Sequence, residues 1–228
     1  MYQTKPIDPL QIIDLKQSIL EDNDKDAEAL REELKKENTF LINLMSSPGS
    51  GKTSTLLSLI PYFQGKIQWG VMEADIDSDV DARTLCQAGI PSIQLHTGGM
   101  CHLDADMTRQ GIRALGRPDL DLIILENVGN LVCPAEFDTG SSLNMTILSV
   151  PEGDDKPAKY PLMYQECSVL VVNKIDTLPV FDFDKTRMEQ YARSCNPDTR
   201  IFYISAKTGE GVEALARYLL SQISRGLQ

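Results

Sequence analysis

The residues best suited to chemistry form one short stretch, Ser46-Ser-Pro-Gly-Ser-Gly-Lys-Thr53, between an apolar run and a helical run. Glycines let backbone N–H groups curl around phosphate oxygens, lysine reaches the β- and γ-phosphates, and a threonine hydroxyl can bind Mg²⁺. The usual form of this pattern begins with glycine, whereas this chain has Ser46, but every element that contacts phosphate is present. The predicted phosphate-binding residues are Gly49, Ser50, Gly51, Lys52, Thr53 and Ser54.

A second pattern, Asn173-Lys174-Ile175-Asp176, follows the apolar run SVLVV and bears on the choice of base. A carboxylate after a strand can accept hydrogen bonds from both N1–H and the amino group of guanine, and adenine offers no such pair of donors. Ser205-Ala206-Lys207 follows a later strand, RIFYI. These patterns, in this order at strand ends, predict GTP rather than ATP. The base-side residues are Asn173, Lys174, Asp176, Ser205, Ala206 and Lys207.

Acidic residues at the ends of other apolar runs indicate hydrolysis. Glu126 ends LDLIILE, and Gly129 follows it closely. Ligands of open parallel sheets bind beyond the carboxyl ends of strands, so we expect Glu126 near Mg²⁺ and Gly129 near the γ-phosphate. The predicted catalytic residues are Lys52, Asp75, Glu126 and Gly129, and the predicted Mg²⁺ ligands are Thr53, Asp75 and Glu126. Three further acidic residues are expected to be solvent-facing charges or helix caps: Asp77, Asp79 and Asp81.

One of the chain's two histidines adjoins a cysteine, as Cys101-His102, in a glycine-rich loop. Thiolate and imidazole together suit Ni²⁺ or Zn²⁺. Cys133 lies at most ~13 Å of extended chain beyond Gly129, on the segment that must move when the γ-phosphate leaves. The predicted metal ligands are Cys101, His102 and Cys133, with burial of small thiols as the alternative. The remaining cysteines are expected on helical stretches, as core or helix-face residues: Cys86, Cys167 and Cys195.

The elements that must position these residues are apolar runs separated by helical stretches. Short runs that are almost wholly apolar suit strands buried on both faces, which favours a doubly wound, mostly parallel α/β sheet of about seven strands, with flanking helices, in a P-loop NTPase fold. The predicted strands lie in FLINLMS, IQWGVMEAD, SIQLH, LDLIILEN, LNMTILSV, SVLVVNK and RIFYIS.

Residues 1–37 differ from the rest, because they are rich in charge and carry apolar residues at helical spacing. The spacing predicts two amphipathic helices that pack on the core or reach a partner. Their apolar positions are Ile12, Leu15 and Ile19, then Ala27, Leu30 and Leu34. The predicted organisation is an N-terminal helical extension, residues 1–37, and a G domain with inserted metal-binding loops, residues 38–228.

Composition narrows the classes of partner. The 228 residues include 22 Lys plus Arg against 33 Asp plus Glu, a formal net charge of −11 at pH 7. This charge repels nucleic acid and anionic membranes, so neither is expected as a partner. The first residues do not resemble a secretory signal, and five scattered cysteines do not suggest a disulfide framework. We therefore expect a cytoplasmic protein.

Longer strings resemble the HypB family of hydrogenase nickel-incorporation GTPases across residues 38–228: FLINLMSSPGSGKT, TGGMCHLDADM, LENVGNLVCPAEFD, LSVPEGDDKPAKYP and VVNKID. The resemblance implies a dimerising P-loop GTPase with slow hydrolysis, GTP-dependent homodimerisation, and a nickel or zinc site on Cys101, His102 and Cys133 near the dimer interface. It also implies delivery of Ni²⁺ to the hydrogenase large subunit, with an accessory metallochaperone as partner. The chain lacks the cysteine-rich or histidine-rich nickel motifs of some members, so storage of several nickel ions is not expected.

Two other functions fit part of the pattern. Urease-maturation GTPases are similar in fold but carry Cys-Pro-His, whereas here Ala135 follows Cys133-Pro134. A non-catalytic scaffold that buffers metal would use the G domain only as a dimerisation switch. No glutamine follows Gly129 and no arginine finger is evident, so we expect a lysine supplied across a dimer to complete the hydrolytic site. The family suggests Lys156 or Lys159.

Overall fold

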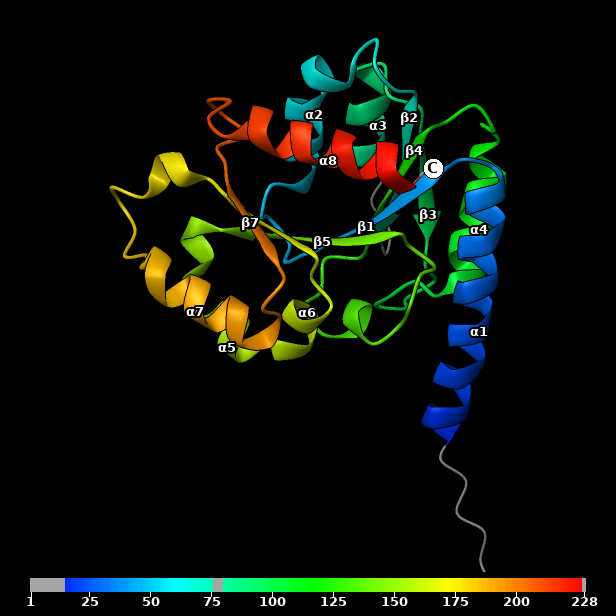
Figure 1. Ribbon diagram of the computed structural model, residues 1–228, viewed down its shortest axis with the longest axis horizontal. Helices are drawn as coiled ribbons and strands as arrows, with labels where there is room; N and C mark the ends of the chain where they lie inside the picture. Colours follow the sequence, from blue (N-terminus) through cyan, green and yellow to red (C-terminus); the bar gives the residue numbers. More distant parts are fainter. Residues whose placement is uncertain (1–14, 76–79, 227–228) are drawn as a thin grey trace, which may run out of the picture.

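The computed structural model of the protein describes residues 15–75 and 80–226, with side chains from residue 20 onward (Figure 1). Seven strands form one sheet in the order β3-β2-β4-β1-β5-β6-β7, and every neighbouring pair is parallel. All seven predicted strands are confirmed. The strands are β1 (Phe40–Ser46), β2 (Trp69–Asp75), β3 (Ser92–His96), β4 (Leu122–Glu126), β5 (Leu143–Ser149), β6 (Val169–Asn173) and β7 (Arg200–Tyr203).

The strands are apolar throughout because helices cover both faces of the sheet. Every residue of β1, β4 and β6 is buried, as expected for parallel strands between two helical layers. One face packs against α2 (Lys52–Phe63), α3 (Val80–Gln87) and α8 (Val212–Gly226). The other face packs against α1 and α4 at one end and against α6 and α7 at the other.

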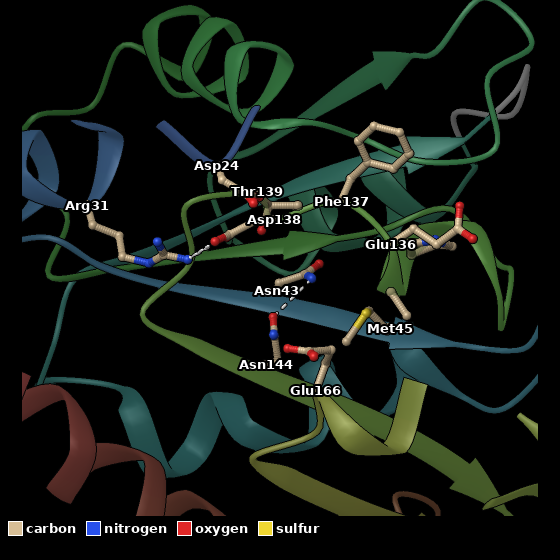
Figure 2. Close-up of a pocket in the computed structure, with 12 residues that line it drawn as sticks. Asp24, Arg31, Asn43, Met45, Glu136, Phe137, Asp138, Thr139, Asn144 and Glu166 are labelled. Carbon is tan, nitrogen blue, oxygen red and sulfur yellow. Dashed lines mark hydrogen bonds and ion pairs between the residues drawn. The ribbon is translucent and has the colours of Figure 1, made fainter. Parts of the chain in front are cut away.

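The helices of the second face are α1 (Leu15–Lys36), α4 (Ala105–Leu115), α6 (Pro161–Gln165) and α7 (Lys185–Cys195), with the short α5 (Lys156–Lys159) packed on α7. Figure 1 shows α1 running alongside α4. Between the two helix pairs, residues 134–139 cover the middle of this face and line a polar cavity of about 300 Å³ over β1 (Figure 2). None of the helices in the described ranges is long and apolar enough to cross a membrane.

The N-terminal part of the chain corrects one prediction. Within the described residues there is a single helix, α1, where the sequence suggested two. Neither glycine nor proline interrupts residues 15–36, so no helix-breaking residue separates the two predicted helices within this range. Leu30 and Leu34 of α1 share a core cluster with strand residues. Ile12 lies outside the described residues, and the division at residue 37 stays a prediction.

Candidate functional site

The phosphate loop connects the end of β1 to the start of α2 at the carboxyl edge of the sheet. Gly49 and Gly51 have φ angles of 76° and 98°, a left-handed conformation that glycine adopts without steric cost. A Cβ atom on Gly51 would also lie 2.5 Å from Asn173 Nδ2. The loop leads directly into Lys52 and Thr53, the first residues of α2, where unpaired N–H groups and the helix dipole favour a bound phosphate.

Ser46, which stands where the usual pattern has glycine, is fully buried. Its hydroxyl accepts a hydrogen bond from Ser50 Oγ at 2.7 Å and donates one to the Ser47 carbonyl at 2.8 Å. The departure from the pattern therefore adds two hydrogen bonds inside the loop.

The residues after β6 are bonded directly to the phosphate loop. Asn173 Nδ2 donates to the Ser50 carbonyl at 3.0 Å, and its Oδ1 accepts from the Ala206 N–H at 3.1 Å. Lys174 has a φ of 62°, which is uncommon for a residue with a side chain, and its Nζ donates to the Gly49 carbonyl at 2.7 Å. The three predicted motifs are thus joined into one site.

A cavity of about 260 Å³ lies beside the phosphate loop, next to the two predicted base motifs, Asn173–Asp176 and Ser205–Lys207. Asp176 lines it and accepts a hydrogen bond from Ser205 Oγ at 2.7 Å, which fixes the direction of the carboxylate. Ser205 itself is fully buried and so orients Asp176 from behind. The lining residues are Gly51, Ser54, Asn173, Lys174, Asp176, Thr177, Ala206 and Lys207; Thr177 was not predicted.

Three carboxylates meet where β2 and β4 end. Glu73 and Glu126 occupy the same register on these neighbouring strands, and with Asp81 they form a group whose ligand oxygens lie within 4.8 Å of one another. Glu126 also forms an ion pair with Lys52, 3.7 Å from its Oε1. One oxygen of Glu73 and one of Glu126 are buried without a hydrogen-bond partner, an arrangement that is costly unless a cation or proton is supplied.

The pKa values of these carboxylates reflect the same crowding. Burial, with the charges of Glu126 and Asp75 adding to it, raises the pKa of Glu73 to about 8. Burial also raises the pKa of Glu126 to about 7, although Lys52 opposes the shift. Two buried acids that resist ionisation without a counter-charge are suited to a bound divalent cation.

The carboxylate group extends two sequence predictions. Asp81 is exposed and lies in the first turn of α3, as predicted, and its carboxylate also approaches Glu73 and Glu126. Asp75 lies near enough to raise the pKa of Glu126 and remains a predicted ligand. Glu73 was not among the predicted ligands, although its position two residues before Asp75 puts both on one face of β2. Asp77 and Asp79 lie outside the described residues.

The segment after β4 touches the phosphate loop. A Cβ atom on Gly129 would lie 3.0 Å from Pro48 Cγ, so glycine permits this close approach. Asn127, which is fully buried, donates from Nδ2 to Asn43 Oδ1 at 3.1 Å and accepts from the Val128 N–H at 2.9 Å. The buried amides were not predicted, because they lie in or next to strands that otherwise read as apolar.

The three predicted metal ligands, Cys101, His102 and Cys133, lie near one another. Cys101 Sγ is 3.9 Å from His102 Nδ1. A hydrogen bond with the Cys101 thiol is the main cause that raises the pKa of Cys133, and burial adds to it. Burial lowers the pKa of His102, which favours the neutral imidazole that binds metals. The His102 ring stacks on Phe137, with centroids 3.8 Å apart.

These ligands are near one another but do not yet form a closed coordination site. Among the described residues, the one group of three possible ligand atoms within 4.8 Å is the carboxylate group, and the Cys101, His102 and Cys133 set does not meet that limit. Binding of one ion by all three therefore requires the side chains to move closer together. Of the other cysteines, Cys86 on α3 is exposed and Cys195 ends α7. Cys167 is buried in the core, as predicted, but it lies in the loop between α6 and β6 and not in a helix.

Both lysines predicted to act across a dimer have neighbours in their own chain. Lys159 Nζ forms an ion pair with Asp155 Oδ2 at 2.6 Å. Lys156 Nζ lies 5.4 Å from the centroid of the Tyr160 ring. Their assignment to a hydrolytic role stays a prediction.

The chain is similar to known proteins in both sequence and fold. Residues 40–203 match the family described as CobW/HypB/UreG, nucleotide-binding domain. Hydrogenase maturation factor HypB of Azotobacter chroococcum mcd 1 is 42% identical over 202 residues, which cover 89% of this chain and 66% of that protein. Hydrogenase/urease maturation factor HypB of Helicobacter hepaticus is 37% identical over 220 residues, covering 95% and 90%. The crystal structure of HypB from Helicobacter pylori in complex with nickel has a TM-score of 0.85 at 35% identity, covering 91% and 97%.

Proposed function

This chain belongs to the HypB family of P-loop nucleotide-binding proteins, and from that premise we propose that it hydrolyses GTP in order to control a bound nickel ion destined for a [NiFe]-hydrogenase. The observation that carries the proposal is the placement of Cys133. Its thiol lies beside Cys101, and it follows the segment in which Gly129 touches the phosphate loop. Loss of the γ-phosphate and movement of a metal ligand therefore involve the same short segment.

GTP is the proposed nucleotide because Asp176 lines the base cavity and Ser205 fixes its carboxylate. Lys52 and the phosphate loop would hold the phosphates. Lys52 pairs with Glu126, so a bound phosphate competes with that carboxylate for the lysine. Hydrolysis itself is inferred from the acidic residues at the ends of β2 and β4.

Mg²⁺ fits the site by its donor set. The unpartnered buried oxygens of Glu73 and Glu126 are the hard oxygen ligands that Mg²⁺ accepts. Thr53, Asp75 and Glu126 remain the proposed ligands, and the structure supports adding Glu73 and Asp81 as acidic groups around the ion. When bound, Mg²⁺ supplies positive charge that offsets the charge developing on the phosphates.

Nickel is the proposed cargo, held by Cys101, His102 and Cys133, and Zn²⁺ is its expected competitor because both accept thiolate and imidazole. A GTP-dependent homodimer, an accessory metallochaperone and the hydrogenase large subunit are the proposed partners. The name of the Helicobacter hepaticus relative includes urease, so service to urease is the second function to test. In both cases the site of action is proposed to be the cytoplasm.

The experiment is a titration of Ni²⁺ into protein bound to GDP and to a non-hydrolysable GTP analogue, with Cys133→Ala as the control. We expect the two nucleotide states to differ in nickel affinity by a factor of ~5–150, the usual range of coupling between sites. Equal affinities in both states, or unchanged affinity in Cys133→Ala, would contradict the proposal. Complementation of hydrogenase-deficient and urease-deficient hosts separates the two cargo recipients, and GTP turnover separates an enzyme from a non-catalytic scaffold.

A further inference from the structure

The two loops that carry the proposed metal ligands are joined by one side chain that belongs to neither of them. Asn23 lies on α1 and is buried, with 8% of its surface exposed. Its Nδ2 donates to the Asp138 carbonyl at 2.9 Å, and its Oδ1 accepts from the Ala105 N–H at 3.0 Å. Both hydrogen bonds connect segments more than 80 residues apart in sequence.

The two attachment points lie close to the ligands in sequence. Ala105 begins α4, directly after the Cys101-His102 loop, and its N–H is one of those left without a partner inside the helix. Asp138 follows Phe137, whose ring stacks on His102. A single amide therefore fixes the end of one ligand loop against the segment that leads away from Cys133.

Neighbouring residues of α1 hold the same segment in place. Arg31 forms an ion pair with Asp138 (Figure 2) and donates from Nε to the Ser141 carbonyl at 3.0 Å. A Cβ atom on Gly140 would lie 2.8 Å from Leu30 Cδ2, so this part of the segment lies directly against the helix. The helix that follows the Cys101-His102 loop is also tied to α1, because Arg109 of α4 forms an ion pair with Glu33 of α1, with Nε and Oε2 3.2 Å apart.

From these contacts we propose that Asn23 is a positioning residue for the metal centre: it holds the Cys101-His102 loop and the Cys133 segment together so that their thiols and imidazole can share one ion. The inference rests on the proposed metal-binding function and deepens it. The role needs a side chain that donates to one loop and accepts from the other, and an asparagine amide does both. Residues that orient metal ligands from outside the coordination sphere typically contribute about 10–100-fold in affinity.

Two substitutions separate this role from packing. Asn23→Asp keeps the size of the side chain and the acceptor for Ala105 N–H, but it removes the donor to the Asp138 carbonyl. Asn23→Ser shortens the side chain so that it no longer spans both loops. The matched control is Ala27→Gly, one turn further along α1, which weakens the buried helix without removing a bond to either loop.

Two readouts are measured on the full chain: Ni²⁺ affinity, followed by thiolate-to-nickel absorption, and capture of the Cys101 and Cys133 thiols by phenylarsine oxide, which binds paired thiols. We expect both Asn23 variants to lose about 10–100-fold in Ni²⁺ affinity and to capture the arsenical more slowly. Ala27→Gly is expected to lower the melting temperature and leave both readouts as in the wild type, and GDP affinity is expected to be unchanged in all three variants.

Wild-type behaviour of Asn23→Asp in both readouts would overturn the inference, as would an equal loss in Ala27→Gly. The arsenical keeps the test independent of nickel. If wild-type Ni²⁺ binding does not depend on Cys133, the proposed function fails, and arsenical capture still decides whether Asn23 holds the two thiols together.

Discussion

We expect base selection to depend on a single carboxylate, Asp176, which accepts a hydrogen bond from Ser205 and lines the proposed base cavity. Asp176→Asn replaces an acceptor with an amide that offers a donor, so GTP should bind more weakly by ~1–3 kcal/mol. Xanthosine triphosphate, which presents an oxygen where guanine has an amino group, should gain affinity. Competition titrations with GTP, ATP and xanthosine triphosphate check this, and binding of ATP by the wild type as tightly as GTP would show that the carboxylate does not select guanine.

Gly51 is required for two separate reasons, and a substitution can distinguish them. Alanine there must adopt a φ of 98° and also meets the Asn173 amide at 2.5 Å. Gly65 has a φ of 73°, but a Cβ atom there would meet nothing within 4 Å, so Gly65→Ala carries the backbone cost of about 1–2 kcal/mol alone. We expect both variants to lose stability in urea titrations and only Gly51→Ala to lose nucleotide binding. Similar nucleotide affinities for the two variants would contradict the role of the Asn173 contact.

At the scale of elements, Asp154, which lies just before α5, fixes that part of the chain to the start of α7. Its oxygens accept hydrogen bonds from the Asp184 N–H and from the Arg187 guanidinium. Burial alone raises the pKa of Asp154, but these hydrogen bonds outweigh it and hold the pKa below its usual 3.8. The stability they contribute is therefore present above that usual value and is lost as the pH falls through the lower folded-state value.

Asp154→Asn should accordingly lower the free energy of unfolding at neutral pH by ~1–3 kcal/mol, and the difference from wild type should shrink at about pH 3. Urea titrations at the two pH values measure both effects. The control is Asp155→Asn, which breaks the exposed ion pair with Lys159 and should cost little. A deficit in Asp154→Asn that persists unchanged in acid would mean that ionisation of Asp154 is not its source.

The elements differ in how well the sequence predicts them, and the reason is burial. The strands were predictable because a parallel strand between two helical layers is apolar at every position, as in β4 and β6. The single helix α1 was divided in two because Asn23 interrupts its apolar stripe, and the sequence does not show that a buried amide binds two distant loops there. The same holds for Asn43 and Asn127, whose partners lie on other strands.

The site was predictable where a motif is local and was missed where residues meet through the fold. Gly49 to Thr53 and Asn173 to Asp176 each lie on one loop, so the order of types along the chain identifies them. The carboxylate group joins Glu73, Asp81 and Glu126 from three elements, and only the register of β2 against β4 brings two of them together.

At the scale of the whole molecule, we expect hydrolysis to need a positive group beyond Lys52, supplied by a second chain. Under GTP, hydrolysis per chain should rise with protein concentration across the range in which dimers form. Lys156→Ala and Lys159→Ala, measured separately, show which lysine acts in the partner. Because Lys159 is already paired with Asp155, Asp155→Asn serves as the control that alters this pair without removing a lysine. A rate per chain that is independent of concentration would rule out assistance by a partner.

The strands on the two sides of β1 lead into different parts of the proposed site. The strands on one side, β4, β2 and β3, lead into the carboxylates and the cysteine loops, and on the other side β6 and β7 lead into the base motifs. The two halves meet at the phosphate loop, through Gly129 on one side and Asn173 and Lys174 on the other. The effects on the free energy of unfolding of substitutions far apart in opposite halves should then be additive. Evolution can accordingly exchange the cargo of such a protein by altering one half of the sheet while the other half continues to recognise the same nucleotide.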